Sequence, residues 1–234
     1  MKDIELVVFD FDQTIINSAP GFDNAFKQIK IELQKFLDAH EIDKRVEPYS
    51  AELRKKIWDV DKKGQYNRDL WWNQLFKVLD IEDIQFKNEE ITNLTKVYWD
   101  TTIEFTELYP DSLEILTYLR GKYKIGLLTD TDGTPGVKQE RLERSKILEF
   151  FDGIMVAGED VPEIKPDPKP FLKLAEHLGV APSASVMVGD KPFSDIKGGK
   201  AAGFHTVLIL RENWEIDPIP DYEIKTLLEL KSIL

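Results

Sequence analysis

Short apolar runs, rich in residues that favour β-strands, recur along this chain at residues 6–9, 124–128, 154–156, 185–188 and 206–210. Between the later runs, apolar residues return at helical spacing within residues 113–119, 137–147, 170–178 and 195–202. This alternation is typical of a parallel sheet that helices cover on both faces. The sequence therefore predicts an α/β core of Rossmann-like architecture.

The pattern is different from about residue 18 to about residue 106, where strand-like runs disappear. Long amphipathic stretches replace them, at residues 22–37, 51–60, 70–79 and 89–105. We therefore predict two domains. Residues 1–17 and 107–234 form the Rossmann-like core, and residues 18–106 form an inserted α-helical domain.

The ends of the insert predict two hinge regions, near residues 16–20 and 107–111. At the C-terminal end of the chain, residues 221–224 predict a last short strand and residues 225–234 a terminal helix. Pro218 and Pro220 leave the start of this segment open.

Composition limits the classes of partner. With 234 residues and 42% hydrophobic content, the chain can bury a sizeable core. The 43 acidic residues against 31 basic residues give a net charge of −12, which opposes binding to nucleic-acid polymers and to anionic membranes. A small anionic substrate therefore needs a local positive site. Because there is no cysteine, disulfides, thiolate metal sites and cysteine nucleophiles are excluded.

The first residues carry acids where a signal peptide carries a basic stretch, and the apolar run after them is too short for a membrane span. We therefore expect a cytoplasmic protein. The three histidines, His40, His177 and His205, lie far apart and share no metal-binding spacing. The sequence therefore gives no support for a histidine-ligated metal site or for a Ser-His-Asp triad.

Two carboxylates directly follow the first apolar run, in the segment Asp10-Phe11-Asp12-Gln13-Thr14. Residues at the carboxyl end of a strand in an open α/β sheet line the crevice where ligands bind. A slight turn at Phe11 would bring both Asp side chains together, as a nucleophile and its acid/base partner. The alternative is that an Asp here only caps the next helix.

Polar residues also follow the second and third predicted strands of the core. Thr129 and Asp130 offer a hydroxyl and a backbone N–H that suit a phosphate oxygen, although such residues are also common in simple turns. Lys165 lies in a loop that Pro166 and Pro168 stiffen, so its ammonium can act as a fixed charge. Most lysines are solvated surface groups, but an acidic chain that binds an anion needs such a cation.

The fourth predicted strand ends in Gly189-Asp190, and Asp195 follows at the start of the next helix. With Asp10 and Asp12, four carboxylates are then expected at one edge of the sheet. Clustered like charges repel unless a cation lies among them, and oxygen ligands suit a hard divalent ion. We therefore expect bound Mg²⁺. The alternative makes Asp195 a helix cap and Asp190 a turn residue, but it does not explain all four positions together.

Taken in order, these segments resemble the motifs of the haloacid dehalogenase superfamily. The first motif is similar to Asp10–Thr14, the second to Thr129, the third to Lys165, and the fourth to Gly189-Asp190 with Asp195. The resemblance spans nearly the whole chain, and the helical insert resembles the superfamily's first class of cap domain. The stretch after Thr129 and the fourth motif resemble the branch that contains phosphoglycolate phosphatases and nucleotidases.

This resemblance implies a Mg²⁺-dependent phosphatase that acts on a small phosphate monoester. Asp10 would attack phosphorus to give a phosphoaspartate, while Asp12 would protonate the leaving oxygen and then activate water. Mg²⁺ would be held by Asp10, by the backbone carbonyl of Asp12 and by Asp190.

The resemblance also implies the residues that hold the phosphoryl group. Thr129 and Lys165 would bind its oxygens, and the position of Asp130 at the strand end adds this residue to the phosphate-binding candidates. Asp195 would position Lys165 or a metal-bound water, so its part in the metal site would be indirect.

Two other functions stay open at this point. Phosphomutases of the β-phosphoglucomutase type keep both Asp residues of the first motif, so nothing in the core excludes a mutase. A non-catalytic phosphate-binding or regulatory protein can be built on the same fold. Haloacid dehalogenases themselves lack the second Asp, so Asp12 argues against dehalogenation.

Substrate choice is expected to lie in the inserted domain, which must close over the part of the substrate beyond the phosphoryl group. Basic residues gather in the segment 62–68, and Trp71 and Trp72 follow it. Arg68 is thus a candidate substrate-binding residue, and a tryptophan could stack on a ring. The alternative is that both tryptophans pack the helical domain and Arg68 pairs with a nearby acid.

Sugar phosphates, phosphoglycolate and nucleoside monophosphates all remain open as substrates. We expect a monomer, with a dimer through the inserted domain as the alternative.

Overall fold

A computed structural model of the chain describes residues 1–61, 66–82, 84 and 86–234. Most of the predicted basic segment, residues 62–65, lies outside the described residues. The chain divides into two compact units. One contains residues 1–17, 107–131 and 138–234, and the other contains residues 18–106 and 132–137.

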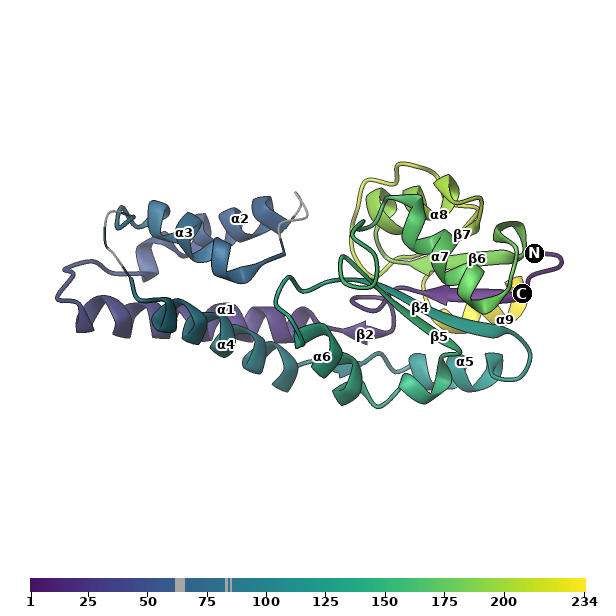
Figure 1. Cartoon of the computed structure of the whole chain (residues 1–234), viewed down its shortest axis with the longest axis horizontal. Coiled ribbons are helices and arrows are strands. Elements are labelled where there is room, and N and C mark those ends of the chain that lie inside the picture. Colours follow the sequence, from purple (N-terminus) through teal and green to yellow (C-terminus); the bar gives the residue numbers. More distant parts are fainter. Residues whose placement is uncertain (62–65, 83, 85) are drawn as a thin grey trace. The chain divides into compact units, whose positions relative to one another are not determined.

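The first unit contains a six-stranded parallel sheet in the order β5-β4-β1-β6-β7-β8 (Figure 1). The strands are β1 Leu6–Phe9, β4 Lys124–Asp130, β5 Gly153–Ala157, β6 Ser185–Gly189, β7 His205–Ile209 and β8 Tyr222–Ile224. From β1 the chain continues to β4 and β5 on one side, and later to β6, β7 and β8 on the other. The carboxyl end of β1 therefore lies at a topological switch point, where open α/β sheets bind ligands.

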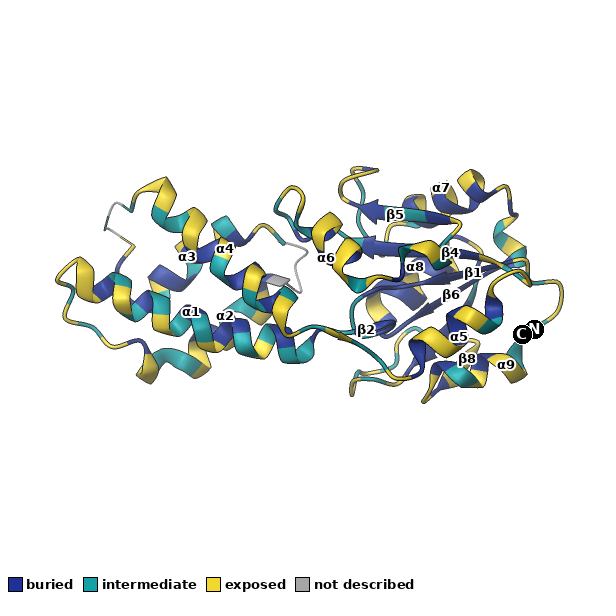
Figure 2. Cartoon of the chain, turned by 90° about the horizontal axis from the view of Figure 1, so that it is seen from below, coloured by how far each residue is buried: buried dark blue, intermediate teal, exposed yellow. Residues whose placement is uncertain are grey.

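Helices cover both faces of this sheet. Alternate residues of β1 enter different apolar clusters, because successive side chains of a strand point to opposite faces. Val7 and Phe9 pack with α5, α6 and α9, and Leu6 and Val8 pack with α7. The helices are α5 Ser112–Leu119, α6 Val137–Ser145, α7 Pro168–Leu178, α8 Lys197–Ala201 and α9 Leu230–Ile233. Strands β1, β4 and β6 are dark blue over most of their length in Figure 2, and the predicted Rossmann-like α/β core is confirmed.

The second unit is helical. Its helices are α1 Ala19–Ala39, α2 Ser50–Asp61, α3 Arg68–Val78 and α4 Asn88–Glu104. α1 and α4 lie side by side, and a Cβ at Gly21 would overlap the backbone carbonyl of Thr102, so glycine permits their close approach. Even α1, with 21 residues, is amphipathic, and among the described residues no helix is both long and apolar enough to cross a membrane.

Aromatic side chains fill the core of this helical unit. Trp71 and Trp72 are 1% and 0% exposed, and the indole N–H of Trp72 donates a hydrogen bond of 2.8 Å to the Thr95 hydroxyl. Both tryptophans therefore pack in the core of the helical unit, which is the alternative to substrate stacking given in the sequence analysis.

Trp72→Ala is expected to lower the free energy of unfolding by about 3–5 kcal/mol, because it leaves a large cavity and removes the hydrogen bond to the Thr95 hydroxyl. Chemical denaturation measures this change. Trp58→Ala is the control, because Trp58 is 46% exposed in α2 and its truncation should change stability far less. Unchanged stability in Trp72→Ala, together with lost activity, would instead favour stacking of Trp72 on substrate.

Two short elements at the predicted hinges were not expected from the sequence. β2 Ile16–Asn17 and β3 Glu107–Leu108 form an antiparallel pair, in which Ile16 faces Leu108. A strand of two residues is too short to show an alternation of apolar and polar residues, so the sequence pattern does not predict it.

The predicted terminal helix over residues 225–234 is too long. Only a 3₁₀ turn at Leu227–Glu229 and the short α9 occur there. The reason is a capping box: the Glu229 carboxylate accepts the N–H groups of Lys225 and Thr226 at 2.8 and 2.9 Å, which fixes the helix start after Thr226. Other short turns occur at Glu47–Tyr49, Leu148–Phe150, Pro182–Ala184 and, in π form, Pro192–Ile196.

Candidate active site

The chain turns sharply after β1 and so presents Asp10 and Asp12 at the sheet edge. The Asp10 N–H still continues the sheet, donating to the Val188 carbonyl at 2.9 Å. The N–H groups of Ile15 and Ile16 then both donate to the Phe11 carbonyl, at 3.1 and 3.0 Å. The turn expected at Phe11 is therefore present, but it does not bring the two carboxylates together, because Asp10 contacts Lys165 and Asp12 contacts Lys138 and Arg141.

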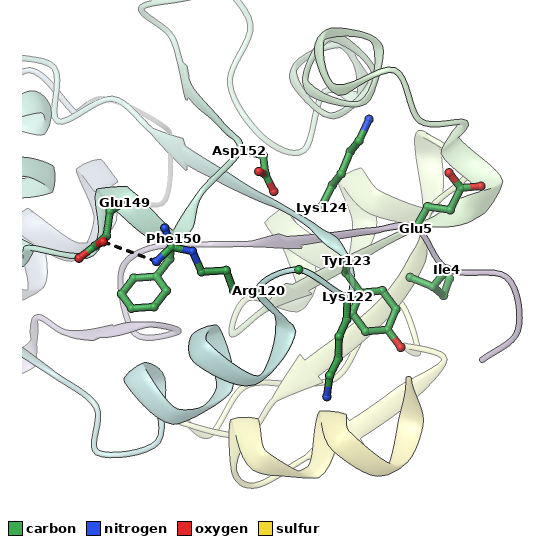
Figure 3. A pocket seen from close by; sticks show the side chains of 10 residues that line it. Ile4, Glu5, Arg120, Lys122, Tyr123, Lys124, Glu149, Phe150 and Asp152 are labelled. Carbon is green, nitrogen blue, oxygen red and sulfur yellow. Dashed lines mark hydrogen bonds and ion pairs between the residues drawn. The ribbon is translucent and has the colours of Figure 1, made fainter.

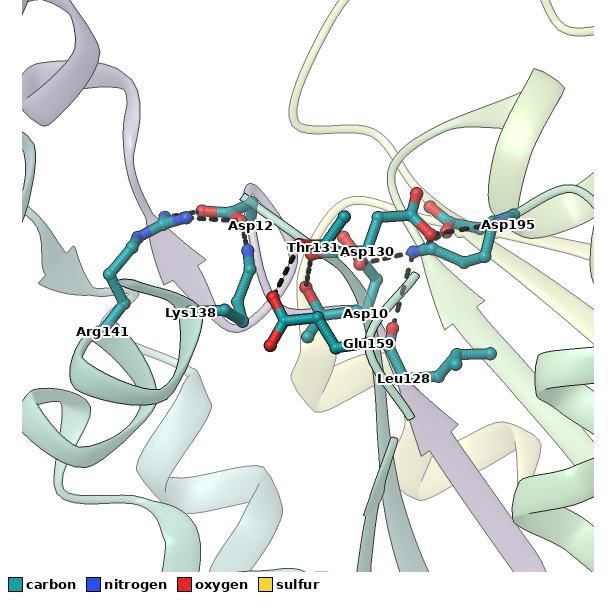
Figure 4. Close-up of polar contacts among 11 residues, drawn as sticks. Asp10, Asp12, Leu128, Asp130, Thr131, Lys138, Arg141, Glu159 and Asp195 are labelled. Atoms are coloured by element: carbon teal, nitrogen blue, oxygen red, sulfur yellow. Dashed lines mark hydrogen bonds and ion pairs between the residues drawn. The ribbon is translucent and has the colours of Figure 1, made fainter. Parts of the chain in front are cut away.

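Lys165 joins two of the predicted carboxylates. Its ammonium lies 2.6 Å from the Asp10 carboxylate and 2.7 Å from the Asp195 carboxylate (Figure 4). All three side chains are buried, with Lys165 only 5% exposed. Burial opposes the charge of Lys165, but the carboxylates of Asp10 and Asp195 raise its pKa well above the usual value. Lys165 is thus a fixed buried cation, and the predicted loop delivers it to the crevice.

Asp190 completes a cluster of acids. Carboxylate oxygens of Asp10, Asp190 and Asp195 lie within 4.8 Å of one another. Both oxygens of Asp190 and Oδ2 of Asp10 are buried and, within the described part of the chain, accept no hydrogen bond. Burial raises the pKa of Asp190 to about 8 and also raises the pKa of Asp10.

Buried acceptors without hydrogen bonds are rare in native proteins and often mark the position of an ion. The oxygen donors of Asp10 and Asp190 suit a hard divalent cation such as Mg²⁺, so these residues fit the metal that the sequence analysis expects. A bound cation would also oppose the effect of burial on the pKa of Asp190, because it favours the ionised carboxylate.

Gly189 explains how Asp195 enters this cluster. A Cβ at Gly189 would overlap the Asp195 carboxylate, so only glycine lets the acid fold back against the end of β6. Oδ2 of Asp195 also accepts the Lys191 N–H at 3.0 Å. This explains the spacing between Gly189 and Asp195. The Asp195 carboxylate packs against Gly189, accepts the N–H of Lys191 in its own loop, and contacts Lys165.

Thr129 and Asp130 lie at the end of β4, beside the same crevice. Thr129 is 2% exposed. The Asp130 carboxylate accepts the backbone N–H of Lys165 at 3.0 Å and so fastens the lysine loop to the strand. Sequence reasoning gave Asp130 a phosphate contact through its own N–H, and it missed this anchoring bond. The contacts of both residues with phosphate stay predictions.

The Asp12 carboxylate has different partners from Asp10. It is turned toward α6, where the ammonium of Lys138 lies 3.0 Å from Oδ2 and Arg141 contacts both oxygens (Figure 4). Sequence reasoning missed both cations. The only signal available was their spacing of three residues, which places them on one face of a predicted helix.

Arg68 lies inside the helical unit. Its side chain is 4% exposed, its guanidinium lies 3.3 Å from the ring centre of Trp71 and 5.0 Å from that of Trp99, and it donates to the Tyr66 carbonyl at 3.1 Å. Contact with aromatic faces stabilises a buried guanidinium. The structure thus gives Arg68 a packing role within its own unit, and its predicted contact with substrate stays a prediction.

A separate hollow of about 470 Å³ opens near the amino ends of β1 and β4, around Glu5 and Lys124 (Figure 3). In this hollow Arg120 pairs with Glu149 at 3.5 Å, and the ammonium of Lys124 donates to the Leu178 carbonyl. None of the candidate catalytic residues lines it. The cluster of Asp10, Asp190 and Asp195 lies instead at the opposite, carboxyl edge of the sheet.

The sequence model of one protein family, described as haloacid dehalogenase-like hydrolase, matches residues 4–203. The chain is 34% identical over 158 residues to a phosphoglycolate phosphatase of Nitrosococcus oceani, covering 65% of this chain and 68% of that protein. It is 29% identical to a glyceraldehyde 3-phosphate phosphatase of Methanopyrus kandleri, over 99% and 97% of the two chains. The crystal structure of a HAD phosphatase from Thermococcus onnurineus is similar with a TM-score of 0.72 and 31% identity, over 98% and 97% of the chains.

Proposed function

The chain belongs to the family of haloacid dehalogenase-like hydrolases, and we propose that it is a Mg²⁺-dependent phosphatase that forms a phosphoaspartate on Asp10. The observation that carries this proposal is the buried contact of 2.6 Å between the Asp10 carboxylate and Lys165, beside carboxylate oxygens of Asp190 that accept no hydrogen bond among the described residues. Asp10 is then the nucleophile, Lys165 the fixed cation, and Asp10 with Asp190 the acids that can bind a metal. These groups suit phosphoryl transfer, because positioning and electrostatics supply most of the reduction of its barrier.

In the first half-reaction, an oxygen of Asp10 attacks phosphorus while the bond from phosphorus to the ester oxygen breaks. Lys165 holds Oδ1 of Asp10 and carries the positive charge that the phosphoryl oxygens require. Asp195 fixes the lysine from its other side at 2.7 Å. Asp12 gives its proton to the leaving oxygen, so that the product departs as an alcohol.

In the second half-reaction, Asp12 takes a proton from water, and the water oxygen attacks the phosphorus of the phosphoaspartate. The bond between Asp10 and phosphorus breaks, and inorganic phosphate and free Asp10 result. One carboxylate thus acts as the nucleophile and the other moves protons.

Asp10, Asp190 and the backbone carbonyl of Asp12 are the groups proposed to hold the metal. When bound there, Mg²⁺ would offset the repulsion between the anionic nucleophile and the anionic phosphate ester. Asp195 takes part only indirectly, since its carboxylate contacts Lys165 and its own loop.

The proposed substrate is a small phosphorylated metabolite with an alkyl ester. The relatives named for phosphoglycolate and for glyceraldehyde 3-phosphate support this class, since both compounds are small alkyl phosphates. A net charge of −12 agrees with a substrate that is captured locally at Lys165 rather than attracted by the protein as a whole.

Metal removal tests the proposal. Phosphate release should be measured from p-nitrophenyl phosphate, phosphoglycolate, glyceraldehyde 3-phosphate, a sugar phosphate and a nucleoside monophosphate. We expect turnover of at least one ester with Mg²⁺, its loss in excess EDTA, and its return when Mg²⁺ is restored, because Asp190 and Asp10 then regain a counter-charge. Equal turnover in EDTA would contradict the metal assignment. Isomerisation of a sugar phosphate without release of phosphate would favour a mutase.

A further inference from the structure

Two cations of α6 lie buried against the acid/base carboxylate. Lys138 is 1% exposed and Arg141 is 3% exposed. The ammonium of Lys138 donates to Oδ2 of Asp12 at 3.0 Å, one guanidinium nitrogen of Arg141 donates to the same oxygen at 3.2 Å, and the other contacts Oδ1. The spacing of three residues puts both side chains on one face of α6, above the turn that follows β1.

This arrangement is unfavourable if stability is its only purpose. Taking a guanidinium and an ammonium out of water costs free energy that a nearby carboxylate only partly offsets, and apolar residues of similar size often serve a fold as well. Leu142, the next residue on α6, shows that this helix does supply ordinary apolar packing to the core. A reason other than stability is therefore needed for placing two cations on Asp12.

The contacts fix the Asp12 carboxylate in both position and orientation. Arg141 reaches both oxygens, and a guanidinium that contacts two carboxylate oxygens sets the plane of the acid as well as its place. Lys138 and Arg141 also lie 5.7 and 5.6 Å from the ring centre of Phe11, the fully buried residue between the two aspartates. The whole turn is thus held from the side of α6.

The direction of Asp12 suits its proposed chemistry. In an in-line displacement the leaving oxygen lies on the far side of phosphorus from the nucleophile. The water that attacks the phosphoaspartate takes the same in-line position, so the base that activates this water must stand apart from Asp10. Asp12 does so: its carboxylate is turned toward α6, whereas Asp10 contacts Lys165 (Figure 4).

We propose that Lys138 and Arg141 are positioning residues, which hold the Asp12 carboxylate in place to take a proton from water in the second half-reaction. The inference rests on the proposed phosphatase function and assigns neither cation a contact with substrate. It predicts that both act on the reaction only through Asp12.

The first test separates the two half-reactions. Hydrolysis of the phosphoaspartate needs the base, whereas kcat/KM reports only the steps up to formation of the phosphoaspartate. Arg141→Gln should therefore lower kcat by roughly 10- to 100-fold for the ester that the wild type hydrolyses fastest and make phosphorylated Asp10 accumulate in acid-quenched samples, while kcat/KM falls by less than about threefold. Arg141→Lys keeps the charge but loses the two-point contact, so its loss should lie between wild type and Arg141→Gln. Arg144→Gln is the matched control, because Arg144 lies on the same helix, is exposed and pairs with Glu140.

The second test is a double-mutant cycle with Asp12→Asn. If Arg141 acts through Asp12, Arg141→Gln should change kcat by less than about twofold when Asp12 is already replaced. Equal losses of kcat in the wild-type and Asp12→Asn backgrounds, or a loss of kcat/KM as large as the loss of kcat, would overturn the positioning role. Wild-type rates in Arg141→Gln would overturn it as well.

Circular dichroism and thermal unfolding establish that each variant is folded. Should Arg141→Gln not fold, Arg141→Lys carries the test, and an unchanged kcat without accumulated phosphorylated Asp10 in that variant counts against the proposal. Failure of the phosphatase function itself has a different signature, since the wild type would then release phosphate from no ester.

Discussion

Asp10→Asn is expected to abolish phosphate release and to leave the protein folded. An amide is a poor nucleophile and cannot form the phosphoaspartate, so kcat should fall by roughly 10⁴-fold or more. The fold should survive because Lys165 keeps its second partner, the Asp195 carboxylate at 2.7 Å. Removing one acid also relieves repulsion in a cluster where burial already raises the pKa of Asp10.

Phosphate release and thermal unfolding of purified Asp10→Asn check both halves of this expectation. Asp100→Asn is the control, because Asp100 is an exposed acid of α4 that pairs with Lys96. The mass of the Asp10→Asn protein must also be verified, since deamidation would restore the acid. Substantial activity in a variant of verified mass would remove the covalent mechanism.

Lys165→Met is expected to damage both catalysis and stability. Loss of the cation that faces the phosphoryl oxygens should lower kcat by roughly 10²- to 10³-fold, as for other preorganised donors to developing charge. The buried carboxylates of Asp10 and Asp195 would also lose their shared counter-charge, which should lower the free energy of unfolding in EDTA by about 3–5 kcal/mol at neutral pH.

The stability loss in Lys165→Met should depend on pH with a definite sign. Burial raises the pKa of Asp10, while Lys165 lowers it, so the variant raises that pKa further. A carboxyl whose folded-state pKa exceeds its unfolded-state pKa stabilises the protein below the unfolded value, and this contribution is lost as the pH rises through the folded value. The difference from wild type should therefore be smaller in mildly acidic than in mildly alkaline buffer. Urea denaturation in EDTA at several pH values measures it, and a difference that grows toward acid would be contrary to this reasoning.

The sequence predicts the core well because its strands are buried on both faces. Runs such as Leu6–Phe9 are apolar at every position, and β1 has those same bounds in the structure. The chemical residues lie directly after such runs, as with Asp10 after β1 and Asp190 after β6, so strand position alone brings them to one edge. Lys165 is harder to place, and the resemblance to a known set of motifs supplied its role.

The parts that sequence reasoning missed depend on contacts between distant segments. Lys138 and Arg141 lie about 130 residues after Asp12, and a basic residue on a predicted helix gives no sign that it will be buried. Arg68 shows that a sequence can leave two roles open: substrate contact and packing were both considered, and the structure places its guanidinium against the rings of Trp71 and Trp99 in its own unit. The pattern of apolar residues shows which face of a helix packs against the core. It does not show which charged side chains will be buried in contact with a distant segment.

The central claim is that Asp10 carries the phosphoryl group during turnover, and acid-quenched peptide mass spectrometry tests it most directly. The protein should be mixed with Mg²⁺ and excess of its fastest ester, quenched in acid within a turnover, and digested. We expect the mass of one HPO₃ group on the peptide that contains Asp10, in wild type and more persistently in Asp12→Asn, whose second half-reaction lacks its base. Rapid turnover with no phosphorylated Asp10 in either protein would contradict the mechanism.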